Sequence, residues 1–287
     1  MLRLLGIGDN TVDLYLDEGM QYPGGNAVNV TVLARRSGAA TSYLGCFGKD
    51  ALGKLICESL EAEGVDVSHC RLLEGPNSWS RVRHEGGDRV FAGSNPGIRA
   101  CYELTEKDFA FVAEHDVVHT SVHSGLDEEM PRLAAAARLL SYDYSEHWQR
   151  PGVASTFAHV DIAFLSCPRR SLEDCDELMR CCADRGPSVI VATRGSAGAC
   201  ALQGGTMHMH PIEPVDAVDT LGAGDGFVAG FLLAYGSGLG IDAALARGAK
   251  LAAQVCGFKG AFGHGTPILP GQPGLDASKI VRRNDTA

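Results

Sequence analysis

Short apolar runs alternate along the chain with stretches in which apolar residues recur at helical spacing. The apolar runs have the length and the β-branched content of buried strands. They predict strands at residues 4–8, 41–44, 117–119, 161–165 and 189–193. The helical spacing predicts helices at residues 27–36, 52–63 and 133–140. We therefore expect an α/β fold, in which helices cover both faces of a mainly parallel central sheet.

Two segments, near residues 12–17 and 78–92, interrupt this alternation. In the second, residues 80–84 and 89–91 are typical of the two strands of a hairpin, with Gly86-Gly87 as the turn. Polar residues flank these strands, which indicates a small sheet outside the core. Such a sheet could close over a substrate as a lid, or could pair with a second subunit in a homodimer, and the sequence leaves both open.

The chain has 287 residues, of which 45% are hydrophobic, so it can bury one large core. We expect residues 1–270 to form a single domain that includes the lid, and residues 271–287 to be a flexible tail. A net charge of −10 argues against a nucleic-acid partner and favours small-molecule chemistry. No apolar run approaches the length of a membrane span and no signal peptide is evident, so a cytoplasmic location without membrane contact is expected.

Cysteine and histidine are frequent, with ten of each, but their spacing does not indicate a metal site. The sequence contains no Cys-x-x-Cys motif, and Cys181-Cys182 is an adjacent pair with poor geometry for ligation. We expect reduced and mostly buried thiols. His119 and His123 flank a predicted strand and are expected in the core or at its rim, not as ligands.

The most informative stretch is Asp-Thr-Leu-Gly-Ala-Gly-Asp, residues 219–225. It precedes residues 227–235, whose apolar positions recur at helical spacing, so it lies at a helix N-terminus. The backbone N–H groups of Gly222, Ala223 and Gly224, here called the anion cradle, lack helical partners there and admit phosphate oxygens. Asp225 would lie beside phosphate charge, which is explained if it takes a proton from an incoming hydroxyl. A glycine-rich turn with Asp225 as a helix cap is the alternative.

A second glycine pair, Gly24-Gly25, precedes the helix predicted at residues 27–36. Glycines allow close approach of the backbone, and Asn29 offers both a donor and an acceptor to a polyol. Asp9 and Asp13 flank the end of the first strand, where carboxylates can accept hydrogen bonds from sugar hydroxyls. An ordinary helix-start turn and solvated loop carboxylates are the alternatives.

Together these features resemble the ribokinase-like PfkB family of carbohydrate kinases. That family carries an early Gly-Gly motif with a downstream Asn and a late Asp-Thr-x-Gly-Ala-Gly-Asp signature, which residues 219–225 match at every specified position. The resemblance spans residues 4–265. It implies a three-layer αβα sandwich with a small β lid, and ATP-dependent phosphorylation of a sugar hydroxyl. A P-loop kinase and a dinucleotide-dependent oxidoreductase are disfavoured, because neither glycine signature of those classes is present.

The resemblance also implies roles for individual residues. Asp225 would be the base that deprotonates the sugar hydroxyl, and the anion cradle of Gly222, Ala223 and Gly224 would stabilise the transferred phosphoryl group. The sugar-binding positions that it implies are Asp13, Gly24, Gly25 and Asn29.

Nucleotide and ion positions follow from the same resemblance. The ATP-binding positions are Thr193, Gly195 and Gly198 near the phosphates and ribose, Arg194 for added charge, and Ala252, Val255 and Gly260 beside adenine. Asp219 and Thr220 lie where relatives hold a monovalent cation such as K⁺. Relatives use an Asn-x-x-Glu motif to organise Mg²⁺, and residues 166–169 are Ser-Cys-Pro-Arg instead. Either ATP, water and Asp225 hold Mg²⁺, or a basic residue replaces part of that motif.

A second departure bears on the substrate, because the family's Asp-x-Asn-x-Arg segment is Asp-Tyr-Ser-Glu-His at residues 143–147. Residues 8–15, 24–30, 88–91 and 143–145 are similar to the family members that phosphorylate the 6-hydroxyl of fructoselysine. Such a fructosamine carries a protonated amine, to which Asp9 is expected to bind. Arg89 is a further candidate for substrate binding. The alternatives are a kinase of a neutral sugar (fructose or ribose) or of a nucleoside, and a non-catalytic sugar sensor, against which the intact Asp225 argues.

Overall fold

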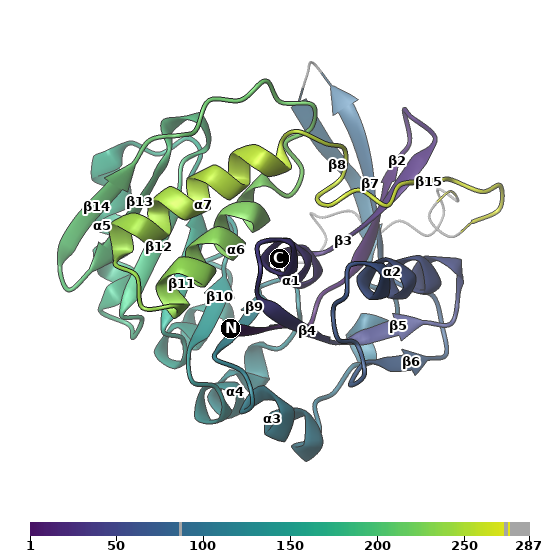
Figure 1. Cartoon of the computed structure of the whole chain (residues 1–287), viewed down its shortest axis with the longest axis horizontal. Helices are drawn as coiled ribbons and strands as arrows, with labels where there is room; N and C mark the ends of the chain where they lie inside the picture. The colour runs from purple at the N-terminus through teal and green to yellow at the C-terminus, as the bar shows by residue number, and fades with distance from the viewer. Residues whose placement is uncertain (86–87, 273–274, 276–287) are drawn as a thin grey trace.

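The computed structural model of the chain describes residues 1–85, 88–272 and 275. Its centre is an eight-stranded sheet in the order β14-β13-β12-β11-β10-β9-β1-β4 (Figure 1). The strands are β1 (Arg3–Ile7), β4 (Ala40–Leu44), β9 (Val117–Ser121), β10 (Leu140–Asp143), β11 (Ile162–Ser166), β12 (Val189–Thr193), β13 (Ala199–Gln203) and β14 (Thr206–His210). From β4 to β12 all neighbours are parallel, whereas β13 and β14 are antiparallel. The predicted mainly parallel sheet is confirmed.

Both faces of this sheet are buried, because consecutive residues of its strands point to opposite sides. Leu4 belongs to one core cluster and Leu5 to the other, and Val117 and Val118 divide in the same way. The helices that contribute to the Leu4 cluster are α1 (Asn26–Arg36), α2 (Ala51–Ala62), α6 (Ala223–Gly236) and α7 (Ile241–Val255). Those of the Leu5 cluster are α3 (Glu106–Val112), α4 (Met130–Ala136) and α5 (Leu172–Ala183). The result is a three-layer αβα sandwich.

Every strand predicted for the central sheet is present, but one helix was predicted too far toward the C-terminus: α4 begins at Met130, three residues before the predicted start. The helix expected at residues 133–140 is α4, which ends at Ala136. The backbone of Ala137 is already extended, and Leu140 begins β10, where it pairs with Val118 of β9. The apolar residues after Ala136 therefore belong to a buried strand, and the alanine-rich composition obscured this boundary.

A second, five-stranded sheet, here called the lid sheet, has the order β15-β3-β2-β7-β8. Its strands are β2 (Thr11–Tyr15), β3 (Met20–Gly24), β7 (Trp79–Glu85), β8 (Asp88–Asn95) and β15 (Thr266–Pro267). Strands are thus present at both segments that interrupt the alternation, whereas β3 and β15 were not predicted. The expected Gly86-Gly87 turn lies outside the described residues, as does most of the expected tail at residues 271–287.

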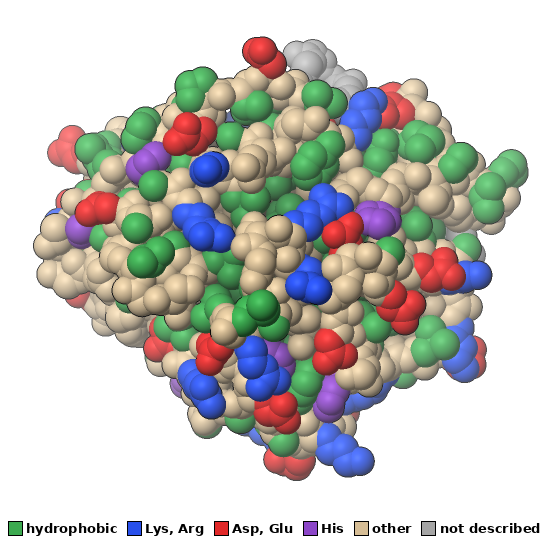
Figure 2. Space-filling view, in the orientation of Figure 1, with side chains coloured by type: hydrophobic (Ala, Val, Ile, Leu, Met, Phe, Trp, Pro, Cys, Tyr) green, Lys and Arg blue, Asp and Glu red, His purple; other side chains and the backbone are tan. Residues whose placement is uncertain are grey.

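Shorter elements connect these layers. Strands β5 (Cys46–Gly48) and β6 (Arg71–Leu73) form a separate parallel pair. The 3₁₀ turns are η1 (Gly97–Cys101), η2 (Asp127–Glu129), η3 (Val153–His159) and η4 (Gly195–Ala197). Among the residues that the structure describes, no helix combines the length and apolar character of a membrane span. Acidic and basic side chains are interspersed on the face that Figure 2 shows.

The sheet edge at the carboxyl ends of the parallel strands is where polar side chains gather. Asp9 follows β1, Ser121 ends β9, Asp143 ends β10 and Thr193 ends β12. In open α/β sheets this edge is the usual place for a ligand. Helices α1 and α6 both begin near it, so their positive N-terminal ends face the same region.

Candidate active site

The anion cradle lies at the N-terminus of α6. Gly222 is the N-cap residue, with a left-handed φ of 78°, and a Cβ at this position would lie 2.4 Å from the Cβ of Ala261. The N–H of Gly226 donates to the carbonyl of Gly222 at 2.8 Å. The N–H of Ala223, expected to be free, donates to the carbonyl of Thr220 at 3.3 Å, whereas the N–H groups of Gly224 and Asp225 have no acceptor among the described residues. Two free amides at the positive end of a helix can bind phosphate oxygens.

Asp225 is the third residue of α6, and two amides of α1 hold its carboxylate. Asn29 Nδ2 donates to Asp225 Oδ2 at 2.6 Å, and Asn26 Nδ2 donates to Asp225 Oδ1 at 2.7 Å. Burial raises the pKa of Asp225, the two amides lower it and the charge of Asp9 raises it, so that the pKa reaches about 6. Asp225 is therefore ionised at neutral pH and has a strength suited to accept a proton.

A second carboxylate, that of Asp143, shares an amide with Asp225. Asn26 Nδ2 also donates to Asp143 Oδ2, at 2.8 Å, and the backbone N–H of Ser145 donates to Asp143 Oδ1 at 2.7 Å. Burial and the charges of Asp225 and Asp9 outweigh these hydrogen bonds and raise the pKa of Asp143 to about 7. Neither Asn26 nor Asp143 was predicted to act in catalysis. The sequence could have pointed to them by their positions, because Asn26 directly follows the glycine pair and Asp143 ends a parallel strand.

The predicted sugar-binding residues lie together next to this pair of carboxylates. A Cβ on Gly24 would lie 2.6 Å from Asp13 Oδ2 and 3.8 Å from Asn29 Oδ1. Gly25 has φ 107°, and a Cβ there would lie 2.7 Å from the Cα of Asn10, so the turn requires glycine. Asn29 is 4% exposed, and its Oδ1 has no hydrogen-bond partner among the described residues. A buried, unpaired amide oxygen is suited to accept a ligand hydroxyl.

The chain that carries the cradle and the glycine pair before α1 matches one protein family over most of the chain's length. Residues 6–267 match the model of the pfkB family carbohydrate kinases. The chain belongs to this family. The kinase is 38% identical to fructosamine kinase FrlD of Bacillus subtilis (strain 168), over 93% of this chain and 95% of that protein. It is 34% identical to fructoselysine 6-kinase of Escherichia coli (strain K12), over 91% of this chain and 100% of that protein.

Solved structures share the fold of the kinase. Ribokinase of Arabidopsis thaliana, complexed with ribose and ATP, superimposes with a TM-score of 0.79 at 19% identity, over 91% of this chain and 94% of that one. A putative ribokinase II from E. coli, in complex with ATP and Mg²⁺, superimposes with a TM-score of 0.76 at 20% identity, over 91% of this chain and 95% of that one. The predicted ribokinase-like sandwich and the predicted family are both confirmed, and the kinase is a phosphotransferase.

The surroundings of Asp9 in the kinase differ from those that the sequence predicted. It is 2% exposed, and its carboxylate accepts the backbone N–H groups of Asn26 at 2.6 Å and Ala27 at 3.2 Å. The hydroxyls of Ser121 and Ser124 donate to Asp9 Oδ1 at 2.9 and 3.0 Å. These internal donors occupy both oxygens, so Asp9 fixes the N-terminus of α1 and does not fit the predicted role of binding a substrate amine.

Replacing Asp9 with Asn is expected to lower the free energy of unfolding by about 2 kcal/mol, because an amide group would face donors that now reach a carboxylate. Burial raises the pKa of Asp9, but Arg99, His123 and its hydrogen bonds lower it further, so the net pKa lies below the usual value. Its contribution to stability is therefore lost as the pH falls through that folded-state pKa. Urea unfolding of both proteins at pH 7 and at about pH 3, below the usual pKa of Asp, measures this, and the loss should be smaller at the lower pH. A selective loss of activity on amine-bearing sugars, with unchanged stability, would restore the original interpretation.

The predicted nucleotide residues of the kinase fall into two groups. Thr193 ends β12, and Arg194, Gly195 and Gly198 form the turn that follows, closed by a hydrogen bond from Arg194 N–H to the Gly198 carbonyl at 2.8 Å. Gly198 has φ 85°, and a Cβ there would lie 2.4 Å from the carbonyl oxygen of His210. This turn lies on the same sheet edge as the cradle.

The second group packs beneath the cradle. Val255 is 1% exposed, and its methyl groups lie 3.5 Å and 2.8 Å from the Cβ positions of Gly222 and Gly226. The Cα of Ala252 is 3.3 Å from that same Gly226 position. Gly260, with φ 66°, packs against the ring of Tyr22. Val255 and Ala252 thus pack under the first turn of α6. The predicted contact of these three residues with adenine stays a prediction.

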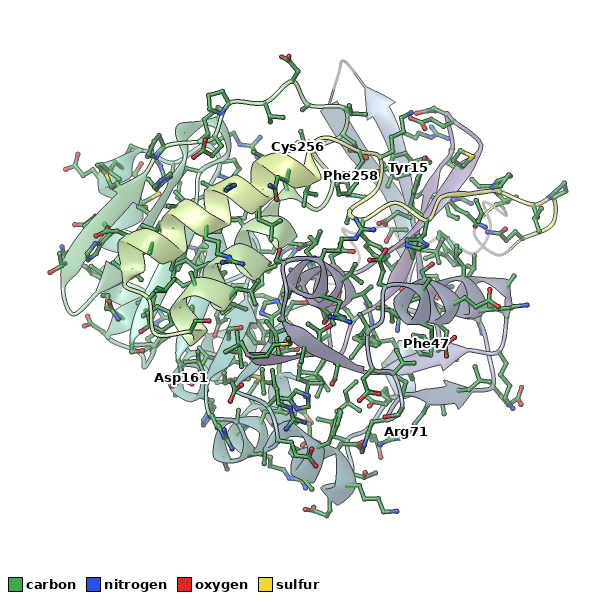
Figure 3. All side chains as sticks on the ribbon, viewed as in Figure 1. Tyr15, Phe47, Arg71, Asp161, Cys256 and Phe258 are labelled. Atoms are coloured by element: carbon green, nitrogen blue, oxygen red, sulfur yellow. The ribbon has the colours of Figure 1, made fainter. Side chains whose placement is uncertain are left out.

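Asp219 ties the loop before the cradle to the lid sheet. The hydroxyl of Tyr15 donates to Asp219 Oδ2 at 2.7 Å, and the N–H groups of Gly260 and Leu221 donate to its two oxygens at 3.0 Å each. The N–H of Asp219 donates to the carbonyl of Cys256 at 3.3 Å, and Figure 3 labels Tyr15 on the lid sheet and Cys256 at the end of α7. Asp219 therefore links this loop to the lid sheet and to Gly260, and the neighbouring Thr220 is exposed. Their predicted role at a monovalent cation stays a prediction.

Arg89 lies in β8, opposite His84 of β7, and its side chain is outside the described part of the chain. His119, expected in the core or at its rim, is completely buried. Most of the described cysteines are buried as well, and none of the described cysteines is in a disulfide.

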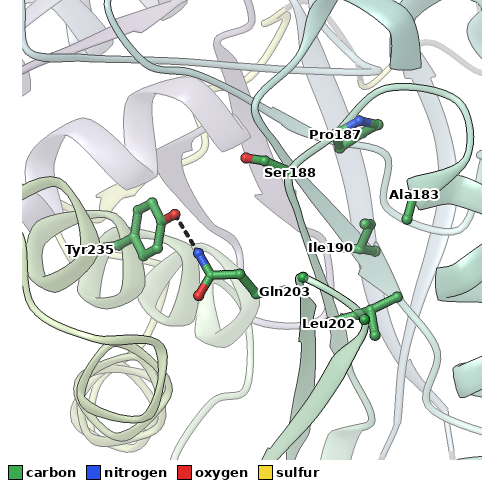
Figure 4. A pocket seen from close by; sticks show the side chains of 9 residues that line it. Ala183, Pro187, Ser188, Ile190, Leu202, Gln203 and Tyr235 are labelled. Carbon is green, nitrogen blue, oxygen red and sulfur yellow. Dashed lines mark hydrogen bonds between the residues drawn. The ribbon is translucent and has the colours of Figure 1, made fainter.

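A cavity of the structure lies away from this site. Its lining includes Pro187 and Ser188, which precede β12, and Gln203, which ends β13 (Figure 4). Gln203 Nε2 donates to the hydroxyl of Tyr235 there at 2.8 Å. The cavity is thus at the amino end of β12, at the sheet edge opposite to Thr193 and the cradle.

Proposed function

We propose that this kinase transfers the γ-phosphoryl group of ATP to the 6-hydroxyl of a fructosamine, with fructoselysine as the first candidate. The observation that carries the phosphotransfer is the position of Asp225. It is one residue beyond the cradle, is held by two amides and has a pKa raised to about 6. The two relatives named for fructosamine and fructoselysine, at 38% and 34% identity, support the choice of acceptor.

In the proposed reaction Asp225 accepts the proton of the sugar hydroxyl. The hydroxyl oxygen then forms a bond to the γ-phosphorus, and the bond between that phosphorus and the β–γ bridging oxygen breaks to release ADP. Asn26 and Asn29 hold the carboxylate in place, so little reorganisation is required when the proton moves. The amides of Gly224 and Asp225 are available to stabilise the charge on the transferred group.

ATP would bring its own divalent ion. Within the described residues, no group of three or more His, Cys, Asp or Glu side chains could hold a metal. We propose that the phosphates, water and Asp225 would hold Mg²⁺, which neutralises phosphate charge when bound.

The amine of a fructosamine requires a carboxylate partner, and we propose Asp143 in place of Asp9. Asp143 is only partly buried, and each of its oxygens has one hydrogen bond from the chain. Its raised pKa reflects burial and the negative charges of Asp225 and Asp9. A bound ammonium group would offset that repulsion, whereas a neutral sugar would not.

The test is ADP release with ATP and Mg²⁺ on fructoselysine, other fructosamines, fructose, ribose and nucleosides. Fructoselysine should have the highest kcat/KM. Replacing Asp143 with Asn should raise the KM for fructoselysine about tenfold and change that for fructose little, since a charged hydrogen bond is worth about 1.5 kcal/mol or more. Asp9→Asn is the matched control and should affect both sugars equally. A preference for fructose or a nucleoside would overturn the fructosamine assignment and leave the phosphotransfer by Asp225 in place.

A further inference from the structure

Behind the two carboxylates lies a buried chain of side-chain hydrogen bonds that the proposed reaction does not use. Ser141 Oγ lies 2.8 Å from His119 Nδ1, and His119 Nε2 lies 2.8 Å from Asn26 Oδ1. Ser141 and His119 are completely buried in β10 and β9, and Asn26 is the first residue of α1. The chain therefore joins two central strands of the sheet to the amide that holds Asp225.

The direction of these hydrogen bonds is determined by the carboxylates. Asn26 Nδ2 lies 2.7 Å from Asp225 and 2.8 Å from Asp143, so both of its hydrogens are donated to oxygens. The Oδ1 of Asn26 must then accept, and only a protonated Nε2 of His119 can donate to it. Burial lowers the pKa of His119 to about 3, against the opposing charge of Asp9, so the ring is neutral. Its Nδ1 is thus an acceptor for the Ser141 hydroxyl.

We propose that His119 is a positioning residue for phosphotransfer: it fixes the orientation of the Asn26 amide, and through that amide the position and proton affinity of Asp225. If Asn26 rotated by half a turn, its Oδ1 would face Asp225 and Asp143 at hydrogen-bond distance and repel both. The neutral ring holds the amide in the other orientation without adding a charge to the site. The inference rests on the proposed role of Asp225 as the base.

The charged groups around Asp225 all favour such a fixed donor. Asp143 of β10 shares the Asn26 amide, and Asp9, which follows β1, adds negative charge to both. Asn29 is the other donor to Asp225. Without the oriented Asn26 amide, Asn29 would be the one remaining donor to Asp225, and the charges of Asp143 and Asp9 would still be near. The pKa of Asp225 would therefore rise.

The experiment compares His119→Leu with His119→Gln. The glutamine amide can reach Asn26 with an N–H as Nε2 does, whereas leucine cannot donate. The pKa of Asp225 is measured directly by carboxyl ¹³C NMR titration of the protein without substrate, with Asp225→Asn to assign the signal. The acidic limb of kcat/KM is measured in parallel with whichever sugar the kinase phosphorylates.

For the unchanged protein we expect the acidic limb near pH 6. His119→Leu should move the acidic limb of kcat/KM and the NMR titration to higher pH by about one unit, which is about a fivefold loss of kcat/KM at pH 6, with little change in KM for the sugar. His119→Gln should stay close to the unchanged protein. Equal titration of Asp225 in all three proteins would overturn the proposal, even if leucine lowers the melting temperature. Should the leucine variant not fold, Ser141→Ala, which removes only the hydroxyl behind the ring, must shift the titration in the same direction or the proposal is wrong. Because the NMR titration needs no turnover, this result is independent of the substrate assignment.

Discussion

Asp225→Asn is expected to lower kcat about a thousandfold or more and to change sugar affinity little. An amide has almost the shape of the carboxylate, but at neutral pH it cannot accept the hydroxyl proton. The new NH₂ group would face the donating Nδ2 of Asn26 or of Asn29. In the unchanged protein the carboxylate accepts hydrogen bonds from these two nitrogens at 2.7 and 2.6 Å. We therefore also expect a modest loss of stability. ADP release measures the turnover, and calorimetric titration with sugar measures the binding.

Asp242→Asn is the matched control for this substitution. Asp242 is an exposed residue of α7 whose carboxylate contacts His208 at the surface, at 2.9 Å. The same chemical change there should leave turnover within twofold of the unchanged protein. If Asp225→Asn lowered kcat by only about tenfold or less, the loss would be smaller than the contribution expected of a general base, and Asp225 would not be the base.

Gly222→Ala is expected to lower kcat/KM about a hundredfold, the effect of losing one oriented donor, and to destabilise the fold by about 2–4 kcal/mol. The added methyl group would lie 2.4 Å from the Cβ and 2.7 Å from the Cα of Ala261. The backbone of Gly222 also has a φ of 78°, which alanine adopts only with strain. Both costs are relieved by moving the first turn of α6, and that movement displaces the cradle. Steady-state kinetics and thermal unfolding check the two effects.

Gly238→Ala separates the backbone cost from the clash. Gly238 has a similar φ of 81°, but a Cβ there would meet no other atom within 4 Å. It should lose only about 1–2 kcal/mol of stability and no activity. If Gly222→Ala behaved like Gly238→Ala in both assays, the fixed position of the cradle would not matter for phosphotransfer.

The sequence predicted the elements that local patterns define. Strand β12 matches the predicted residues 189–193, because a continuous β-branched run is typical of a buried parallel strand. Helix α6 and the cradle before it were recognised from the glycines and the apolar spacing. By contrast, β15 is only two residues long and pairs with β3 from the other end of the chain, so no local pattern announces it.

The candidate site was predictable only in part for a related reason. Asp225 lies in a recognisable motif, but the role of a polar residue elsewhere depends on which donors surround it. Asp9 has the position of a ligand-binding carboxylate in the sequence, and the structure instead puts two N–H groups of α1 against it. Asp143 was noted only because its segment departs from the family pattern, and His119 carries no motif of this site's chemistry. The pairing of β9 with β10 brings both residues to Asn26.

The contacts of Asp225 have a consequence for how the protein is made. Asn26 and Asn29 precede their partner by 199 and 196 positions in the chain. A ribosome that has synthesised the first two hundred residues has therefore produced the N-terminus of α1, which holds the proposed base, but not Asp225 itself. Contacts at such separation form late, after the central strands have closed the intervening loop. A nascent or C-terminally truncated chain that ends before α6 also lacks two of the helices that cover one face of the central sheet. The activity proposed for Asp225 therefore requires nearly complete synthesis.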